Sequence, residues 1–302
     1  MRLSAIVPAT NSPETLAGCL EAIRGAEEAP EELIVVDRAD RPGPAAARNA
    51  GAARASGDVL VFVDADVLPH PDAFRRIRAA FAAEPGLVAL FGSYDDSPAA
   101  DGVVSGFRNL LHHYVHQQAP GEAETFWAGL GAVRREQFFA ADGFDADRYP
   151  NPSVEDIDLG LRLTAAGADV RLDPELQGTH LKGWTLAEMV RTDLLDRGVP
   201  WLTLFLEGGG GATALNLGWR HRLSTAACVT GAVALALGRR RAAVASGAAL
   251  VVLNARFYAL LLRRRGPVEA TFGIGLHAIH HLTAAAAVPL AVGRHLARRA
   301  PS

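Results

Sequence analysis

The chain has 302 residues, a formal net charge of -3 and a mean hydropathy of +0.12. The near-neutral charge excludes a global basic field for nucleic acid, and this hydropathy is high for a purely soluble enzyme. The apolar excess is local. Residues 1–205 have the composition of a soluble α/β domain, whereas residues 223–293 are runs of Ala, Val, Leu and Gly broken by arginine clusters. We therefore expect a soluble domain followed by a membrane tail.

The start of the chain and its cysteines bear on the cellular compartment. The apolar run within residues 1–8 is far shorter than the core of a signal peptide, so we expect the soluble domain to stay in the cytoplasm. The only cysteines, Cys19 and Cys228, offer neither a disulfide framework nor a thiolate metal site. Both are predicted to be packing residues.

Three strand-helix units open the chain. Apolar runs at 3–7, 33–36 and 59–63 predict strands, and helical periodicity predicts a helix that opens at residues 13–14 and extends to about residue 23, and another at 45–55. The third run is apolar throughout, as expected of a strand buried on both faces. Such units build a mostly parallel sheet with right-handed crossovers, whose ligands bind at the carboxyl ends of the strands.

The pattern beyond residue 86 is less regular. We predict a strand at 87–92, a helix at 106–117, a strand or loop at 126–131, a helix at 134–140, a helix opening at Glu155, a strand at 170–172 and an amphipathic helix at 185–206. The last of these has the composition of a segment that meets a bilayer.

Four consecutive glycines at 208–211 predict a flexible joint. Candidate membrane spans follow at 223–238, 242–262 and 268–293. The first is shorter than the roughly 20 residues that a crossing needs, and arginine triplets at both junctions conflict with the positive-inside tendency if all three cross. The sequence therefore predicts a catalytic domain at 1–206, a linker at 207–222 and a helical membrane tail of two or three segments at 223–302.

Two carboxylates follow the third predicted strand, in Asp64-Ala65-Asp66. At an extended strand end they would face the same side and ligate a divalent cation that also holds a diphosphate. The chain contains two further Asp-x-Asp triplets, at 145–147 and 156–158, so the triplet alone is weak. Its place after a buried strand distinguishes it from these, with a solvated turn as the alternative.

Asp37 ends the second predicted strand and would accept a hydrogen bond from a nucleobase, or cap a turn. Arg48 and Asn49 lie in the following helix and would approach a base or phosphate, with a solvated helix face as the alternative. We include all three in the predicted substrate site.

Glu155 and Asp156 begin a helix with further charges one turn away. Such a concentration of carboxylates suits general base catalysis, with helix capping as the alternative. His180 is a candidate third metal ligand, which suits Mn²⁺ better than Mg²⁺. We expect Lys182, the only lysine, to pair with phosphate or a lipid head group, and we include Glu155 and Trp184 among the substrate-binding residues.

The order of these parts resembles the family 2 glycosyltransferases. The segments that carry the resemblance, over roughly residues 1–185, are residues 7–16, 35–37, 47–51, 62–66, 143–145 and 155–162. The resemblance implies a GT-A fold, a nucleotide-sugar donor, a divalent metal (Mn²⁺ or Mg²⁺) and inversion at the anomeric carbon.

By the same resemblance, Asp37 contacts the base, Asp64 and Asp66 belong to the metal and donor site, Asp156 is the catalytic base and His180 completes the metal shell. Two departures stand out. Arg38-Ala39-Asp40 follows Asp37 where such enzymes often continue with another Asp and a Gly-Ser turn, and the Gln-x-x-Arg-Trp motif of processive members is missing. Nucleotide identity is therefore open, and polymer synthesis is not expected.

We predict an enzyme, an inverting, metal-dependent glycosyltransferase that moves a sugar to a hydroxyl of a lipid-linked or cell-envelope glycan. A polyprenyl-phosphate glycosyltransferase is the first alternative, and a catalytically inactive nucleotide-sugar-binding membrane protein is the second. The predicted partners are the donor, the acceptor and the membrane, without nucleic acid. The predicted location is the inner membrane, multi-pass, with the catalytic domain facing the cytoplasm.

Overall fold

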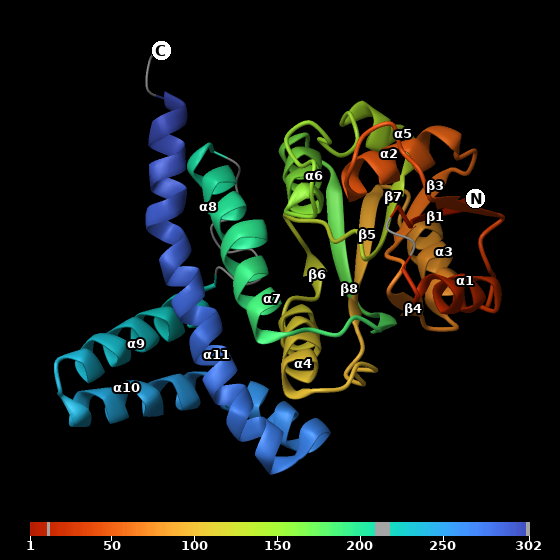
Figure 1. The fold of residues 1–302 in the computed structure, drawn as a ribbon. Coiled ribbons are helices and arrows are strands. Elements are labelled where there is room, and N and C mark those ends of the chain that lie inside the picture. Colours follow the sequence, from red (N-terminus) through yellow and green to blue (C-terminus); the bar gives the residue numbers. More distant parts are fainter. Residues whose placement is uncertain (11–12, 209–217, 300–302) are drawn as a thin grey trace. The chain divides into compact units, whose positions relative to one another are not determined.

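The computed structural model describes residues 1–10, 13–208 and 218–299. The chain divides into two compact units (Figure 1). The first unit contains residues 1–99 and 115–182, and the second contains residues 100–114 and 183–302. The described residues of the first unit extend to Lys182. The domain end predicted at residue 206 stays a prediction.

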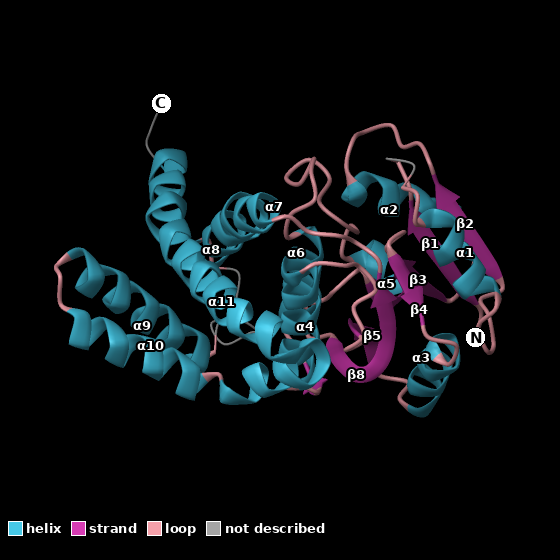
Figure 2. Ribbon diagram, turned by 60° about the horizontal axis from the view of Figure 1, so that its bottom comes forward, coloured by secondary structure: helices cyan, strands magenta, loops and turns pink. Residues whose placement is uncertain are grey.

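The first unit is an α/β domain (Figure 2). Its strands are β1 (Leu3–Pro8), β2 (Glu32–Val36), β3 (Val59–Val63), β4 (Val67–Pro69), β5 (Leu87–Tyr94), β6 (Gly121–Glu122), β7 (Leu130–Arg134) and β8 (Asp169–His180). Its helices are α1 (Leu16–Arg24), α2 (Pro44–Arg54), α3 (Ala73–Ala83), α5 (Arg135–Ala140) and α6 (Glu155–Ala165).

All eight strands form one mixed sheet in the order β2-β1-β3-β7-β5-β8-β4, with β6 paired to β8. Pairing directions show that β1, β2, β3, β5 and β8 run one way, while β4, β6 and β7 run the other. The prediction of a mostly parallel sheet is confirmed. The five parallel strands therefore bring their carboxyl ends to one edge.

Alternation along the strands divides the core between the two faces of the sheet. Val59, Val61 and Val63 face a cluster that includes Cys19 of α1 and Phe74 of α3. On the other face Phe62 meets Phe138 of α5, with ring centroids 5.4 Å apart, and Phe144 at 5.1 Å. Because both faces are covered here, β3 is apolar at every position, as its sequence indicated.

The predicted elements of the first half are confirmed within a few residues, and β3 has the bounds predicted. The largest correction is β8, a strand of 12 residues where the sequence predicted three. Pro174 and Gly178 give its middle the composition of a turn, but the strand continues because it pairs in succession with β5 and β4. His180 is consequently the last residue of a strand.

The second unit is helical. It contains most of α4 (Val103–Gln117), then α7 (Leu186–Arg191), the π-helical segment η1 (Thr192–Gly198), α8 (Val199–Leu206), α9 (Trp219–Ala236), α10 (Arg240–Leu253) and α11 (Ala255–Arg299). The single helix predicted at 185–206 is thus interrupted by η1. Its start is well defined, because Thr185 and Glu188 form a capping box.

The predicted membrane spans need correction. Within the described residues only one helix, over Ala255–Arg298, has the length and hydropathy of a membrane span. The span predicted at 242–262 ends early because α10 stops at Leu253, and Gly266 at φ 77° interrupts α11. A multi-pass tail is therefore not supported. The linker predicted at 207–222 lies largely outside the described residues.

Gly160 determines how closely α6 packs against residues 125–126, which lie before β7 in the sequence. A Cβ atom at this position would lie 2.2 Å from the backbone nitrogen of Phe126 and 2.5 Å from the carbonyl carbon of Thr125. Backbone atoms cannot rotate away as a side chain can. Helix α6 therefore packs at this distance only with glycine at position 160.

We expect Gly160→Ala to destabilise the protein by about 1–3 kcal/mol, because the added methyl group forces two backbone segments apart. Gly86→Ala is the matched control, since a Cβ at Gly86 meets nothing within 4 Å. Thermal unfolding followed by circular dichroism measures both. Equal unfolding temperatures for the two variants would refute this account of the packing.

Candidate active site

The carboxyl edge of the parallel strands gathers the predicted acidic residues. Asp37 follows β2 and is exposed, Asp64 follows β3, and His180 ends β8. The backbone N–H of Asp64 donates to Gly129 O at 3.0 Å, so the segment before β7 reaches the same edge. Ligands of open α/β sheets bind at such an edge.

Arg48 joins two of these acids. It lies in α2, is 4% exposed, and donates from Nη2 to Asp64 Oδ1 at 2.7 Å and from Nη1 to Glu155 Oε1 at 2.9 Å. The guanidinium also lies over the Phe144 ring, 5.5 Å from its centroid. One buried cation therefore fixes the start of α6 against the end of β3.

Asn49, next to Arg48, holds the loop before α6. Its side-chain nitrogen donates to Phe144 O at 2.7 Å, and its side-chain oxygen accepts from Phe144 N at 3.0 Å. The Asn49 side chain thus makes the two main-chain hydrogen bonds with Phe144 that a neighbouring strand would otherwise make. The predicted substrate contact of Asn49 stays a prediction, and in this structure its amide contacts the protein's own main chain.

Asp156 lies in the first turn of α6, where the helix dipole stabilises a carboxylate. Its Oδ2 accepts from Ala128 N at 3.2 Å and its Oδ1 accepts from Ile157 N at 2.8 Å. The side chain is half-buried. Two backbone donors therefore orient this carboxylate beside the segment that reaches the carboxyl edge.

Asp66 and His180 face each other across the turn after β3. Asp66 Oδ2 lies 3.6 Å from His180 Nε2, longer than a hydrogen bond, while Asp66 O accepts from Leu181 N at 2.8 Å. Lys182 is exposed two residues later. The structure thus brings the predicted carboxylate and imidazole together.

The pKa values of the two aspartates move in opposite directions. Burial raises the pKa of Asp64, reinforced by the charges of Asp66 and Glu155 and opposed by Arg48. Burial also acts to raise the pKa of Asp66, but His180 and Lys182 outweigh it and the pKa is lowered. A crowded set of carboxylates with few cations is an arrangement that a bound cation relieves.

Two aromatic residues beside His180 were not predicted. Tyr94, the last residue of β5, stacks on the imidazole with ring centroids 4.1 Å apart and planes at 11°. Trp127 meets Tyr94 edge-on at 4.9 Å. The predicted strand stopped at residue 92, two residues short of Tyr94. A strand-end position was the signal that would have identified it.

A pair formed by a half-buried histidine and a buried aspartate supports the strand ends around His180. His70, which follows β4, contacts Asp95 Oδ2 through Nε2 at 3.1 Å, and the Thr179 hydroxyl donates to the same carboxylate. The hydrogen bond to Asp95 raises the pKa of His70. Burial acts to raise the pKa of Asp95, but the bonds from His70 and Thr179 lower it. Three strand ends are thereby tied together next to His180.

Trp184 belongs to the second unit. Its backbone N–H donates to Ser105 Oγ at 2.9 Å, and the Arg108 guanidinium lies over its ring, 4.9 Å from the centroid. These contacts fix Trp184 within its own unit. Its predicted contact with substrate stays a prediction.

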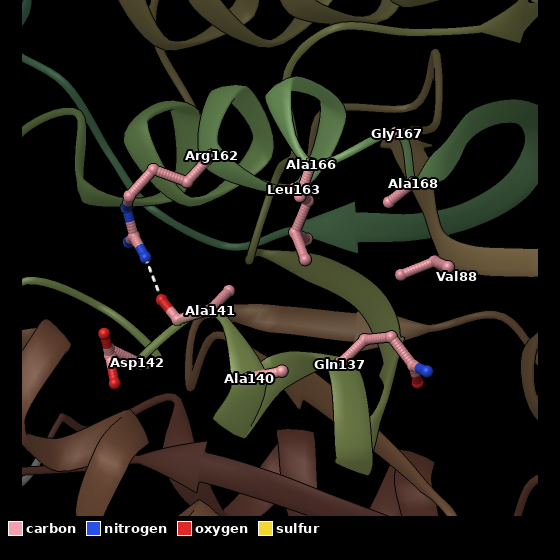
Figure 3. Close-up of a pocket in the computed structure, with 10 residues that line it drawn as sticks. All are labelled: Val88, Gln137, Ala140, Ala141, Asp142, Arg162, Leu163, Ala166, Gly167 and Ala168. Carbon is pink, nitrogen blue, oxygen red and sulfur yellow. Dashed lines mark hydrogen bonds between the residues drawn. The ribbon is translucent and has the colours of Figure 1, made fainter.

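A surface pocket of about 450 Å³ lies between α5 and the last turn of α6 (Figure 3). Its lining includes Val88, Gln137 and Leu163, and Arg162 donates to Ala141 O at its rim. None of the predicted site residues lines it. Because Glu155 and Asp156 are at the opposite end of α6, the pocket and the acidic cluster are separate features.

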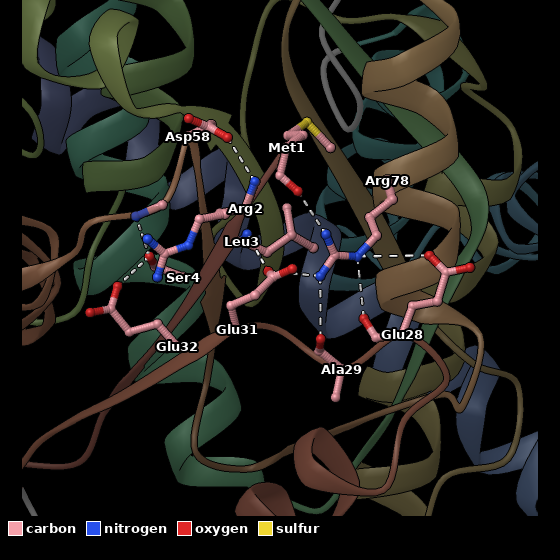
Figure 4. Close-up of polar contacts among 11 residues, drawn as sticks. Met1, Arg2, Leu3, Ser4, Glu28, Ala29, Glu31, Glu32, Asp58 and Arg78 are labelled. Atoms are coloured by element: carbon pink, nitrogen blue, oxygen red, sulfur yellow. Dashed lines mark hydrogen bonds and ion pairs between the residues drawn. The ribbon is translucent and has the colours of Figure 1, made fainter.

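The amino ends of the strands carry a separate set of ion pairs (Figure 4). Arg78 donates to Glu31 Oε2 at 2.8 Å and to Met1 O at 2.8 Å, and Glu31 also accepts from Leu3 N at 2.8 Å. The Arg78 hydrogen bond holds the pKa of Glu31 at about 2. These charges are committed to binding the first strand to α3.

A mixed sheet with carboxylates at the carboxyl edge of its parallel strands, and further carboxylates at the start of α6, is an arrangement that fits the GT-A fold. Residues 38–139 match the model of glycosyl transferase family 2. A comparison with curated proteins returned no match.

The comparison with solved structures finds a similar fold in a mannosyltransferase and weaker similarity in two further proteins. A mannosyltransferase from Pyrobaculum calidifontis, in complex with GDP-Man and Mn²⁺, is 16% identical with a TM-score of 0.54, over 99% of this chain and 88% of that one. TarS 1–349 from S. aureus is 11% identical, with a TM-score of 0.47 over 95% and 91%. Glucosyl-3-phosphoglycerate synthase from Mycobacterium tuberculosis, with Mn²⁺ and UDP-Glc, is 19% identical, with a TM-score of 0.44 over 62% and 73%.

We expect Arg48→Met to destabilise the protein by about 3–5 kcal/mol, because it leaves the Asp64 and Glu155 carboxylates without their shared cation. Arg54→Met is the control, since Arg54 is the exposed last residue of the same helix. Urea unfolding gives both free energies. A loss no larger than that of the control would show that Arg48 does not hold the two segments together.

Proposed function

We propose that the protein is an inverting, metal-dependent glycosyltransferase that transfers a sugar from a nucleotide-sugar donor to a hydroxyl group. The observation that carries this proposal is the bond of Arg48 to both Asp64 and Glu155. These two contacts support the proposal because they hold the start of α6, with Asp156, close to Asp64 at the carboxyl edge of the sheet, where ligands of open α/β sheets bind. The proposed base and the proposed donor site would then share one location.

The proposed metal site consists of Asp66 and His180, with Asp64 beside them. Among the described residues no group of three His, Cys, Asp or Glu side chains is placed to hold a metal alone. Mg²⁺ and Mn²⁺ suit such a site, because they are commonly held by one or two protein ligands together with substrate phosphates and water. When bound, the cation neutralises the charge of the leaving diphosphate.

We assign the proton transfer and the orientation of the base to the protein's own groups. Asp156 takes the proton from the acceptor hydroxyl as its oxygen bonds to the anomeric carbon, and the bond to the nucleoside diphosphate breaks on the opposite face. Because the hydroxyl oxygen attacks from the face opposite the leaving group, the configuration of the anomeric centre is inverted. The Ala128 and Ile157 N–H groups keep the Asp156 carboxylate oriented for this transfer.

Donor recognition is proposed for the neighbouring strand ends. Asp37, exposed after β2, would accept a hydrogen bond from the nucleobase. Arg48 and Asn49 would support the base or phosphate side of the site, Lys182 would pair with the diphosphate, and Trp184 would contact the substrate. The Pyrobaculum calidifontis relative was solved with GDP-Man and Mn²⁺, which supports a nucleotide-sugar donor and a divalent metal for this chain as well.

For the acceptor we propose a lipid-linked or cell-envelope glycan, and for the location the inner membrane with the catalytic domain in the cytoplasm. The apolar helix α11 supports an association with membrane. An acceptor held at the bilayer would explain why a soluble catalytic domain is joined to such a tail.

A polyprenyl-phosphate glycosyltransferase is the competing function. Its acceptor is already an anion and needs no base. The oriented Asp156 carboxylate therefore favours a hydroxyl acceptor. A catalytically inactive nucleotide-sugar-binding protein is the second alternative, and the complete set of acids in one place argues against it.

Metal dependence is the first test. Purified protein incubated with a panel of nucleotide sugars is expected to hydrolyse one donor in the presence of Mn²⁺ or Mg²⁺ and to lose this activity with a chelator. Asp66→Ala is expected to abolish it, and Asp173→Ala, a surface change in β8, to leave it unchanged. Tight donor binding by the wild type without turnover, whatever the acceptor, would favour the inactive protein instead.

The role of Asp156 gives a second prediction. We expect Asp156→Asn to lower kcat by about 10²- to 10⁴-fold while donor binding is retained, because only the proton transfer is removed. Asp158→Asn is the control, since Asp158 lies in the same helical turn but pairs with Arg162 at 2.8 Å. Near-normal transfer by Asp156→Asn to polyprenyl phosphate would instead establish the competing function.

A further inference from the structure

Charge divides sharply along the chain. Residues 208–302 contain twelve arginines and one acidic residue, Glu269, whereas residues 1–207 contain 18 basic and 32 acidic residues. The helical tail is therefore strongly positive and the rest of the chain strongly negative. An anionic surface would therefore attract residues 208–302 and repel residues 1–207.

The helices α9 and α10 expose large apolar side chains. These helices lie side by side as a hairpin in both views (Figures 1 and 2). Leu235 and Leu237 near its tip are 66% and 62% exposed, and Val244 and Val252 of α10 are 72% and 76% exposed. Large apolar side chains left exposed on one hairpin indicate an interaction surface.

The hairpin is too short to cross a bilayer. Helices of 18 and 14 residues are about 27 and 21 Å long, less than the roughly 30 Å of the hydrocarbon core. Both of its ends carry exposed arginines, Arg239 to Arg241 at the tip and Arg222 and Arg256 at the base. Charges at both ends with apolar side chains between them suit a hairpin lying in the plane of the interface.

The middle of α11 is occupied by polar contacts. His280 Nδ1 lies 2.7 Å from Asp193 Oδ2 of η1, and Arg108 of α4 donates to Asp193 Oδ1 at 2.6 Å. The side chains of Arg108 and Asp193 are 10% and 6% exposed. If α11 crossed a bilayer, α4 and η1 would bring this ion pair into the hydrocarbon, at a large cost.

We propose that the α9–α10 hairpin docks in the plane of an anionic lipid bilayer, and that α11 does not cross it. The exposed apolar side chains enter the interface and the arginines bind lipid phosphates. This inference rests on the proposed membrane partner but not on the transfer reaction, because lipid binding is measured without donor or acceptor.

Vesicle flotation tests whether the α9–α10 hairpin binds anionic lipid. The purified full chain is expected to float with vesicles of equal phosphatidylcholine and phosphatidylglycerol and to remain unbound with phosphatidylcholine alone. Arg240→Gln/Arg241→Gln is expected to weaken binding roughly 30-fold, from about 1 kcal/mol for each arginine. The matched control is Arg24→Gln/Arg54→Gln, which removes two exposed helix-end arginines of the first unit. Equal binding to both vesicles, or equal loss in both double variants, would overturn the proposal.

Labelling decides the topology. Val268→Cys and Ala297→Cys place thiols at the two ends of the part of α11 that follows Gly266, both at exposed positions, and a membrane-impermeant maleimide is added outside sealed vesicles carrying the protein. Both variants are expected to react. The parent chain, whose two cysteines are buried, gives the background. Reaction at one end only would show that α11 crosses.

A second copy of this chain is the other occupant that the apolar hairpin could accept. Sedimentation of the chain without lipid is expected to give a monomer. A stable dimer that Leu237→Ser/Val244→Ser converts to monomer, with no change in vesicle binding, would overturn the lipid proposal.

Discussion

The arrangement of the candidate active site in the first unit depends on one buried guanidinium, that of Arg48. Arg48 bonds Asp64 after β3 and Glu155 at the start of α6, which are 91 residues apart in the sequence. Neither carboxylate could be buried there without it. Because the next residue, Asn49, binds the main chain of Phe144, two adjacent residues of α2 hold both the acidic helix and the loop that leads to it.

Much of the fold could be predicted because it depends on local patterns. The continuous apolar run of β3 and the helical spacing in α1 and α2 are visible in single segments. The antiparallel insertion of β7 between β3 and β5 could not be predicted, since it is a long-range pairing. Strand β8 was predicted with only three of its 12 residues for the same reason, as its pairing overrides the turn composition around Pro174.

The candidate site divides in a similar way. The shared location of Asp37 and Asp64 could be predicted from the sequence, because each follows a predicted strand and the carboxyl ends of parallel strands lie at one edge of the sheet. The partners of those acids could not. Arg48 is one of many arginines in the chain, and nothing in its neighbourhood indicates a buried ion pair. The stacking of Tyr94 on His180 likewise depends on two strand ends that meet only in the folded sheet.

Lys182 has a practical consequence. It is the only lysine in the chain, it is exposed, and its charge acts on Asp66. Apart from the amino terminus, the protein therefore has a single primary amine. An amine-reactive fluorophore would attach beside the proposed metal site and nowhere else on the side chains. The chain thus carries its own attachment point for a spectroscopic reporter of donor binding.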